Sequence, residues 1–62
     1  MTTNNAQFKR DVRAIKCVML LARSCLSIDQ VRLQVGEVNI LAYDQARKEL
    51  RPMFVYWDSI YG

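Results

Sequence analysis

The 62-residue chain contains no histidine, only two cysteines, two glycines and one proline. Without histidine, two cysteines cannot complete a zinc site. The sequence also has no glycine-rich phosphate loop, no nucleophile elbow and no nucleophile with an activating base beside it. These absences predict a protein that is not an enzyme and that uses neither a metal nor a cofactor.

Cys17 and Cys25 are eight residues apart, which places their Cα atoms about 12 Å apart on one helix. A disulfide requires a Cα separation below about 7 Å. Both thiols are therefore expected to be reduced and buried as small core residues. No positively charged stretch precedes an apolar run at the start of the chain, and the apolar run over residues 17–22 is too short to span a bilayer. These features predict a soluble, cytoplasmic protein.

Residues 5–26 contain neither glycine nor proline and are predicted to form the first helix, with Asn5 or Thr3 as its N-cap. One apolar seam with the three- and four-residue spacing of a helix face comprises Phe8, Val12, Ile15, Met19, Ala22 and Leu26. A second seam beside it comprises Ala14, Val18, Leu21 and Cys25. Because a single neighbouring helix cannot cover both seams, and because so short a chain needs additional stabilisation, the second seam is the predicted dimer face.

The remaining side of this helix is basic, and the net charge of the whole chain is +3. This side comprises Lys9, Arg13, Lys16, Leu20 and Arg23. A basic helix face suits an acidic protein surface or a phosphate backbone, and it is also typical of an ordinary solvated face. Leu20 is expected to be either buried or an exposed anchor. These five residues, together with Tyr43 and Arg47, are the candidate partner-binding residues.

Ser27 and Gln30 have the spacing of a capping box, which predicts a tight turn over residues 25–27 and a second helix over residues 28–51. Its apolar stripe comprises Ile28, Val31, Val35, Val38, Ala42, Ala46 and Glu49 or Leu50, widened by Leu33, Ile40 and Leu41. Gly36 lies inside this stripe, so two structures compete. Either one helix runs through Gly36, which then allows a neighbour to approach closely, or a turn at Gly36 divides the helix.

Four of the six aromatic residues lie in the last eleven positions. Pro52 is expected to end the preceding helix, since the residue before a proline is pushed out of the α region, and to start a short third helix over residues 53–60. This apolar segment is expected to pack across the open end of the helix pair. The sequence thus predicts a single domain over residues 1–62. Its fold class is all-α, an antiparallel helical hairpin with a short C-terminal helix, dimerising into a four-helix arrangement.

These features together resemble the small bacteriophage proteins that bind one host protein and block it. The features that carry the resemblance are the polar start at residues 2–5, the long basic first helix, the turn at Ser27, the second helix to Arg51 and the aromatic end. They are most similar to the anti-quorum-sensing protein of Mu-like Pseudomonas phages. That resemblance implies a cytoplasmic inhibitor, a dimeric helical hairpin that binds the DNA-binding domain of a host quorum-sensing activator and interferes with the pilus-assembly ATPase. It assigns no binding residue to a position of this chain.

A different function follows if the second helix is divided at Gly36. Residues 28–35, a turn over residues 36–39 and residues 40–51 then form a helix-turn-helix DNA-binding motif. Its second helix carries residue types that read base edges or hold phosphates, namely Tyr43, Gln45, Arg47, Lys48 and Arg51. The motif has a small residue four positions before its glycine, whereas this chain has Arg32 there. A membrane-surface helix is a third interpretation, which the wide apolar arc of the first helix disfavours.

Overall fold

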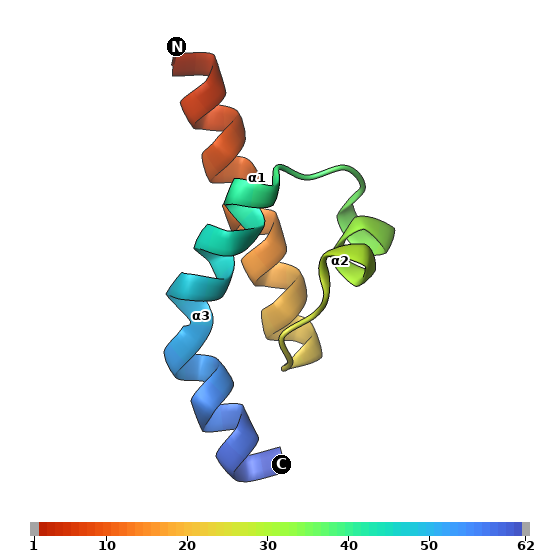
Figure 1. The fold of residues 1–62 in the computed structure, drawn as a ribbon, viewed down its shortest axis with the longest axis vertical. Coiled ribbons are helices and arrows are strands. Elements are labelled where there is room, and N and C mark those ends of the chain that lie inside the picture. The colour runs from red at the N-terminus through yellow and green to blue at the C-terminus, as the bar shows by residue number, and fades with distance from the viewer. Residues whose placement is uncertain (1, 62) are drawn as a thin grey trace.

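The computed structural model describes the backbone of residues 2–61 and the side chains of residues 6–61. Three helices follow one another along the described chain: α1 (Thr2–Ala22), α2 (Ile28–Val35) and α3 (Ile40–Tyr61) (Figure 1). No strand occurs within residues 2–61, so the predicted all-α class is confirmed for this stretch.

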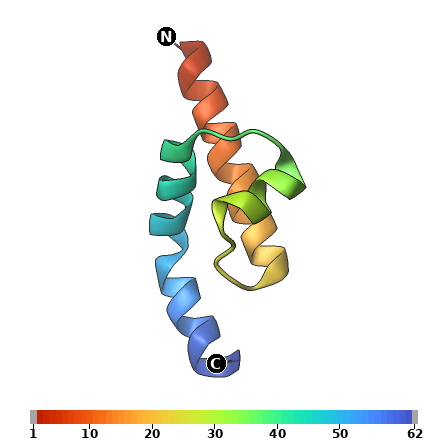
Figure 2. The same ribbon diagram turned by 45° about the vertical axis from the view of Figure 1, so that its right-hand side comes forward.

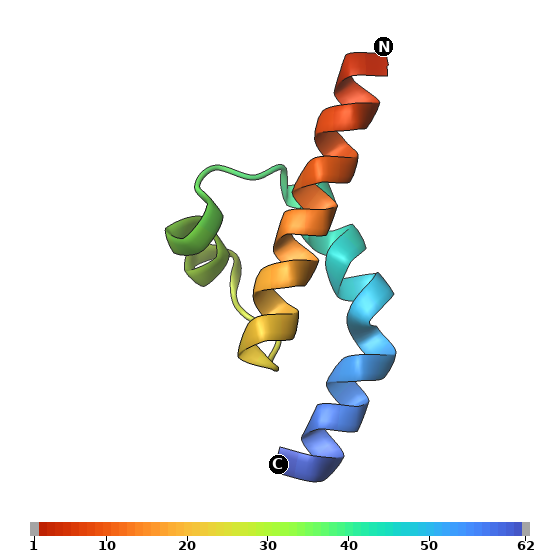
Figure 3. The same ribbon diagram turned by 180° about the vertical axis from the view of Figure 1, so that it is seen from behind.

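The two long helices, α1 and α3, lie side by side and run in the same direction (Figures 1 and 2). Two side-chain hydrogen bonds show this common direction. Lys16 donates to Glu49, and further along the chain Arg23 donates to Tyr61. The predicted antiparallel hairpin is therefore wrong. The chain returns towards the start of the core through α2, which packs on α1, and through the loop after it, before α3 begins (Figure 3).

The first helix begins before both predicted N-caps and ends at Ala22 rather than Leu26. Arg23 adopts a positive φ of 54°, and the Ser24 amide donates a 3.3 Å hydrogen bond back to the carbonyl of Met19. This bond, from the second residue after the helix to the carbonyl five residues earlier, is the Schellman termination. Leu26 therefore lies in the loop and packs against the core from there.

The predicted capping box at the start of α2 is confirmed. The Gln30 amide donates to the Ser27 hydroxyl at 3.3 Å, and the Ser27 amide donates to the Gln30 side-chain oxygen at 3.1 Å. The helix ends at Gly36, whose φ of 85° and ψ of −158° lie in a region that only glycine adopts readily. Of the two competing structures, the divided helix is the one observed. Asn39 then starts α3, because its side-chain oxygen accepts a 2.8 Å hydrogen bond from the Leu41 amide.

Pro52 does not end α3, which continues to Tyr61 and includes the predicted short third helix over residues 53–60. Proline removes one hydrogen bond to the carbonyl four residues earlier, that of Lys48. Both Pro52 and Lys48 are exposed, so water reaches that carbonyl. Beyond the proline, Phe54 and buried Trp57 pack with ring centroids 5.7 Å apart. This packing keeps the last turns helical, and the helix as a whole is bent (Figure 1).

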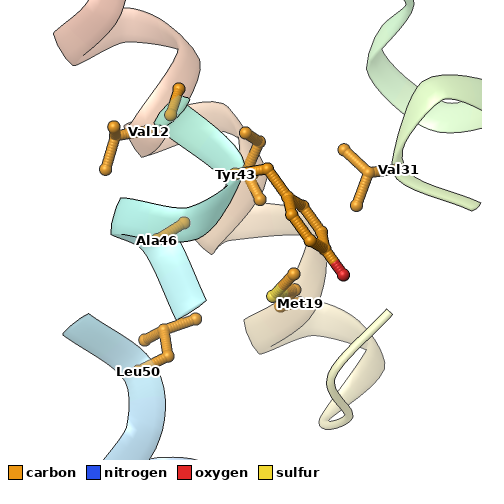
Figure 4. Packing of buried hydrophobic residues seen from close by; sticks show 8 residues of the cluster. Val12, Met19, Val31, Tyr43, Ala46 and Leu50 are labelled. Atoms are coloured by element: carbon orange, nitrogen blue, oxygen red, sulfur yellow. The ribbon is translucent and has the colours of Figure 1, made fainter. Parts of the chain in front are cut away.

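The core lies where the three helices meet (Figure 4). Its buried residues are Val12, Ile15, Met19, Val31, Ala42, Tyr43, Ala46 and Leu50. The small side chains of Ala42 and Ala46 let α3 approach α1 closely, because the distance between packed helices depends on the side chains at the contact. Tyr43 fills the remaining space, with its ring between Met19 and Val31 (Figure 4).

Several apolar residues predicted to be buried are exposed. Cys17 and Cys25 are free, exposed thiols, so their predicted burial is wrong. Leu33, Ile40 and Leu41 were expected to widen the core stripe, and all three are exposed as well. The molecule measures 41 × 22 × 15 Å. Since one helix with its side chains is about 10–12 Å across, a body 15 Å thick has room for only a narrow core.

Candidate protein-binding surfaces

Exposed apolar side chains are the main surface feature of the described residues, which include ten exposed large hydrophobic residues. The same stretch holds no group of three or more potential metal ligands. None of its helices combines the length and the apolar character needed to cross a bilayer. Contiguous exposed apolar surface marks sites of contact with other molecules, so the candidate sites are defined here by where these residues gather.

A groove between α1 and α2 collects the two most exposed of these large hydrophobic residues, Leu33 at 86% and Leu21 at 81%. The α1–α2 groove is lined by Val18, Leu21, Ala22, Leu26, Gln30, Leu33 and Gln34. None of these seven residues is charged, although a quarter of the chain is. Depletion of charge around apolar residues is typical of the centre of a protein–protein interface.

Local sequence explains why Leu33 faces outward. The capping box at Ser27 sets the start of α2, and Val31 is the residue of this helix that is buried in the core. A residue two positions away lies about 200° around the helix, so Leu33 points away from the core. The prediction that Leu33 belongs to the core missed this groove residue, and its two-residue offset from Val31 is the signal that identifies it.

The predicted dimer face is partly the surface of this groove. Val18 is half-buried and Leu21 is exposed, and both line it. Ala14 is half-buried and lies earlier on α1, outside the lining. Cys25 lies in the turn beyond α1 and lines a different hollow at the lower end of the molecule, which includes Trp57. The structure therefore keeps two of the four predicted residues together and separates Cys25 from them.

A second candidate surface lies along α1 and α3. Lys9, Arg13 and Lys16 line a hollow together with Phe8, Val12, Gln45 and Glu49. Lys16 forms a salt bridge to Glu49 with an Nζ–Oε1 distance of 2.6 Å. Lys16 also donates a hydrogen bond to Glu49 through the same two atoms, and the Gln45 amide donates another at 2.8 Å. These two bonds, that from Lys16 first, hold the pKa of Glu49 below its usual value. Among the side chains described, Lys9 and Arg13 form no salt bridge and remain exposed.

The Lys16–Glu49 salt bridge also explains Leu20. Because α1 and α3 are parallel, four residues further along each helix brings Leu20 and Met53 to the same level on the same face. Leu20 is 42% exposed and Met53 is 38% exposed. Of the two states expected for Leu20, buried or exposed, the exposed one is observed. Leu20 is thus an exposed apolar residue one turn beyond the basic surface, and Met53 is an exposed apolar residue one turn beyond Glu49 on α3.

Three other candidate partner-binding residues have roles within the fold. Arg23 lies in the turn that ends α1, and its guanidinium donates a 3.2 Å hydrogen bond to the Tyr61 hydroxyl. Tyr43 is buried, and its hydroxyl donates to the Leu26 carbonyl at 2.7 Å. Arg47 is exposed but lies over the Tyr43 ring, 5.6 Å from its centroid. The prediction that Tyr43 contacts a partner is therefore wrong, because its ring completes the core.

The helix boundaries in the structure agree with those of the predicted helix-turn-helix motif. The observed α2, the four residues after it and the start of α3 coincide with the predicted motif. Arg32 points to solvent and forms a salt bridge to Glu37 at 3.3 Å. Arg47, Lys48 and Arg51 are exposed and share a shallow hollow with Asp44 and Phe54. Tyr43 is not available to read a base because it is buried.

The chain matches no protein-family model, no curated protein and no solved structure in the three comparisons made with known proteins.

Proposed function

We propose that this protein is a non-enzymatic inhibitor that binds another protein through the face shared by α1 and α3. The α1–α3 face comprises Lys9, Arg13, Lys16, Leu20 and Met53. Its basic residues lie towards the start of α1, and its apolar pair lies one turn beyond the Lys16–Glu49 salt bridge. The exposure of Leu20 on α1 and Met53 on α3, one turn beyond the Lys16–Glu49 salt bridge, with Lys9 and Arg13 exposed earlier on α1, is the observation that carries the proposal.

This face combines two contributions to binding. The exposed cations favour an acidic target and speed its association by long-range attraction. The apolar pair supplies surface whose burial gives affinity. A partner that fits both has carboxylates beside an apolar patch. Leu20 therefore acts as an anchor, and the basic residues orient the partner.

The resemblance to phage antagonists extends the proposal to the target. A host regulatory protein, the DNA-binding domain of a quorum-sensing activator, is the proposed partner, and the host cytoplasm is the proposed location. A DNA-binding surface is itself basic, so it does not complement Lys9 and Arg13 electrostatically. Contact with such a domain has to run through Leu20 and Met53 or through acidic residues outside its DNA-contacting surface. The proposal includes assembly as a homodimer, which presents the α1–α3 face twice.

Affinity capture with matched variants tests this function. The immobilised wild-type chain, the Leu20→Glu variant and the Leu41→Glu variant are each exposed to host lysate, and the retained proteins are identified. Leu41 is exposed on α3 and lies about 18 Å along that helix from Met53, remote from Leu20, so its variant is the control. We expect one protein to be retained by wild type and Leu41→Glu and lost with Leu20→Glu. Equal retention by all three, or none above bare resin, contradicts the proposal.

A helix-turn-helix DNA-binding regulator is the second candidate, favoured by the observed division of the helix at Gly36. Phosphate contacts from Arg47, Lys48 and Arg51 give binding that weakens steeply with salt. Measuring duplex DNA binding at several salt concentrations, with the wild type and the Lys48→Ala variant, tests this candidate. A salt slope that falls by about one for Lys48→Ala supports it. Absence of binding at low salt removes it.

A further inference from the structure

The α1–α2 groove combines highly exposed apolar side chains with a hollow. Leu21 of α1 and Leu33 of α2 are its most exposed leucines, and Val18, Ala22 and Leu26 also line it. The same patch therefore supplies a protruding apolar side chain and a hollow that receives one. A two-fold axis requires this combination, because each copy in such an interface presents the same residues to the other.

The charge distribution also favours a second copy as the occupant. Each chain carries a net charge of +3, so two copies repel each other unless the contact avoids cations. The groove lining contains no charged residue. Its polar members are Gln30, whose side-chain oxygen already accepts from the Ser27 amide, and Gln34, whose side-chain amide holds both donors and an acceptor. An amide can therefore pair with the same amide of another copy, whereas a carboxylate or an ammonium group cannot.

The thin shape of the chain supports the same occupant. The principal extents are 41 × 22 × 15 Å, and a chain of this length buries only about 60% of the surface that its unfolded form exposes. Oligomerisation is one of the usual ways in which scaffolds of this size become stable. A second copy over the groove covers the two most exposed leucines and places a new layer against α1 and α2.

We infer that a second copy of this chain docks on the α1–α2 groove around a two-fold axis. Leu33 of each copy inserts between Leu21 and Leu26 of the other, and four helices, α1 and α2 from each copy, meet at the interface. This inference rests on the proposed homodimer and identifies the residues that form it. Five of the seven groove residues lie outside the predicted dimer face, namely Ala22, Leu26, Gln30, Leu33 and Gln34.

The arrangement leaves the α1–α3 face free. Around α1, Leu20 of the α1–α3 face lies about 200° from Val18 and Ala22 of the groove and about 100° from Leu21. The dimer therefore presents two α1–α3 faces on its outer sides. Two such faces increase the apparent affinity for a partner that is itself dimeric, through effective concentration, without any new contact.

Analytical ultracentrifugation of the complete chain tests the interface. The variants are Leu33→Glu, at the most exposed groove residue, and Leu41→Glu, at an exposed leucine outside the groove. We expect wild type and Leu41→Glu to sediment as dimers at micromolar concentration. We expect Leu33→Glu to be monomeric, with a dissociation constant raised at least about 100-fold. Far-ultraviolet circular dichroism checks that the helices remain, because Leu33 contributes little to the monomer core.

The outcomes separate the interface from the homodimer itself. A Leu33→Glu chain that stays dimeric rejects this interface and leaves the homodimer. A wild-type chain that is monomeric at high micromolar concentration rejects both. A melting temperature that rises with protein concentration for wild type, and not for Leu33→Glu, supports the interface independently, because dimer stability depends on concentration. Target capture by Leu33→Glu is expected to persist with reduced avidity, since the α1–α3 face is intact.

Discussion

The phenolic hydroxyl of Tyr43 donates a 2.7 Å hydrogen bond to the backbone carbonyl of Leu26. The bond joins α3 to the loop between α1 and α2, and the ring lies between Met19 of α1 and Val31 of α2 (Figure 4). Leu26 follows the end of α1, so its carbonyl has no partner within that helix. One side chain thus connects all three helices.

Replacing Tyr43 with phenylalanine is expected to lower the free energy of unfolding by about 1 kcal/mol. The ring still fills the core, but the Leu26 carbonyl loses its donor. Urea denaturation measures the change. Tyr56→Phe is the control, because Tyr56 is exposed, and it is expected to stay within about 0.5 kcal/mol of wild type. Equal effects of the two substitutions contradict a role for the Leu26 bond.

Stability is also expected to fall in alkali through Tyr43. Burial, and to a smaller extent Cys25, raises the pKa of the Tyr43 hydroxyl above its usual value of 10.0, while Arg47 lowers it. The unfolded chain releases this proton at a lower pH than the folded chain does. The resulting stability is complete below about pH 10 and is lost as the pH rises through the folded pKa. Unfolding free energies measured above pH 10 should therefore fall more steeply for wild type than for Tyr43→Phe, and parallel curves would exclude this effect.

The free energy of unfolding is expected to fall in acid through protonation of Glu49. The hydrogen bonds from Lys16 and Gln45 hold the pKa of Glu49 below its usual value. A lowered folded pKa contributes stability above the unfolded pKa, and that contribution is lost as the pH falls through the folded pKa. Denaturant titrations between neutral and acidic pH should show a flatter acid limb for Glu49→Gln. Asp44→Asn is the control, because the described side chains give Asp44 no hydrogen bond or salt bridge, and its acid limb should follow wild type.

Pro52→Ala is expected to stabilise the protein by about 1–3 kcal/mol, because alanine restores the amide donor inside a continuous helix. Thermal unfolding followed by circular dichroism measures the increase in melting temperature. Arg51→Ala, at the preceding exposed position, is the control and should change little. A loss of stability in Pro52→Ala would indicate that the chain is not helical at this proline.

The apolar stripe of the second half of the chain was predictable from the sequence even where the helix assignment was open. Val31, Ala42 and Ala46 are buried as their spacing indicates, although α2 and α3 are separate helices. The capping box at Ser27 was also predictable, because it depends on two residues that are three positions apart in the sequence. The end of α1 was not predictable from the sequence, because arginine is not a residue type that favours a positive φ, which Arg23 adopts.

The candidate sites divide in the same way. The basic side of α1 follows from spacing alone, and the structure leaves Lys9 and Arg13 exposed there. Tyr43 was one of the candidate partner-binding residues. It is buried because the loop that contains Leu26 passes over it, a contact across 17 residues.

The sequence by itself determined which sides of each helix are apolar, where α2 begins and that the first helix is basic on one side. These properties depend on residues within one or two turns of each other. Only the tertiary structure decided that α1 and α3 run in parallel, that Lys16 meets Glu49, and that Leu21 and Leu33 line one groove. Helical spacing specifies a face but not the segment that covers it, because that choice depends on loop paths and on contacts between residues far apart in the chain.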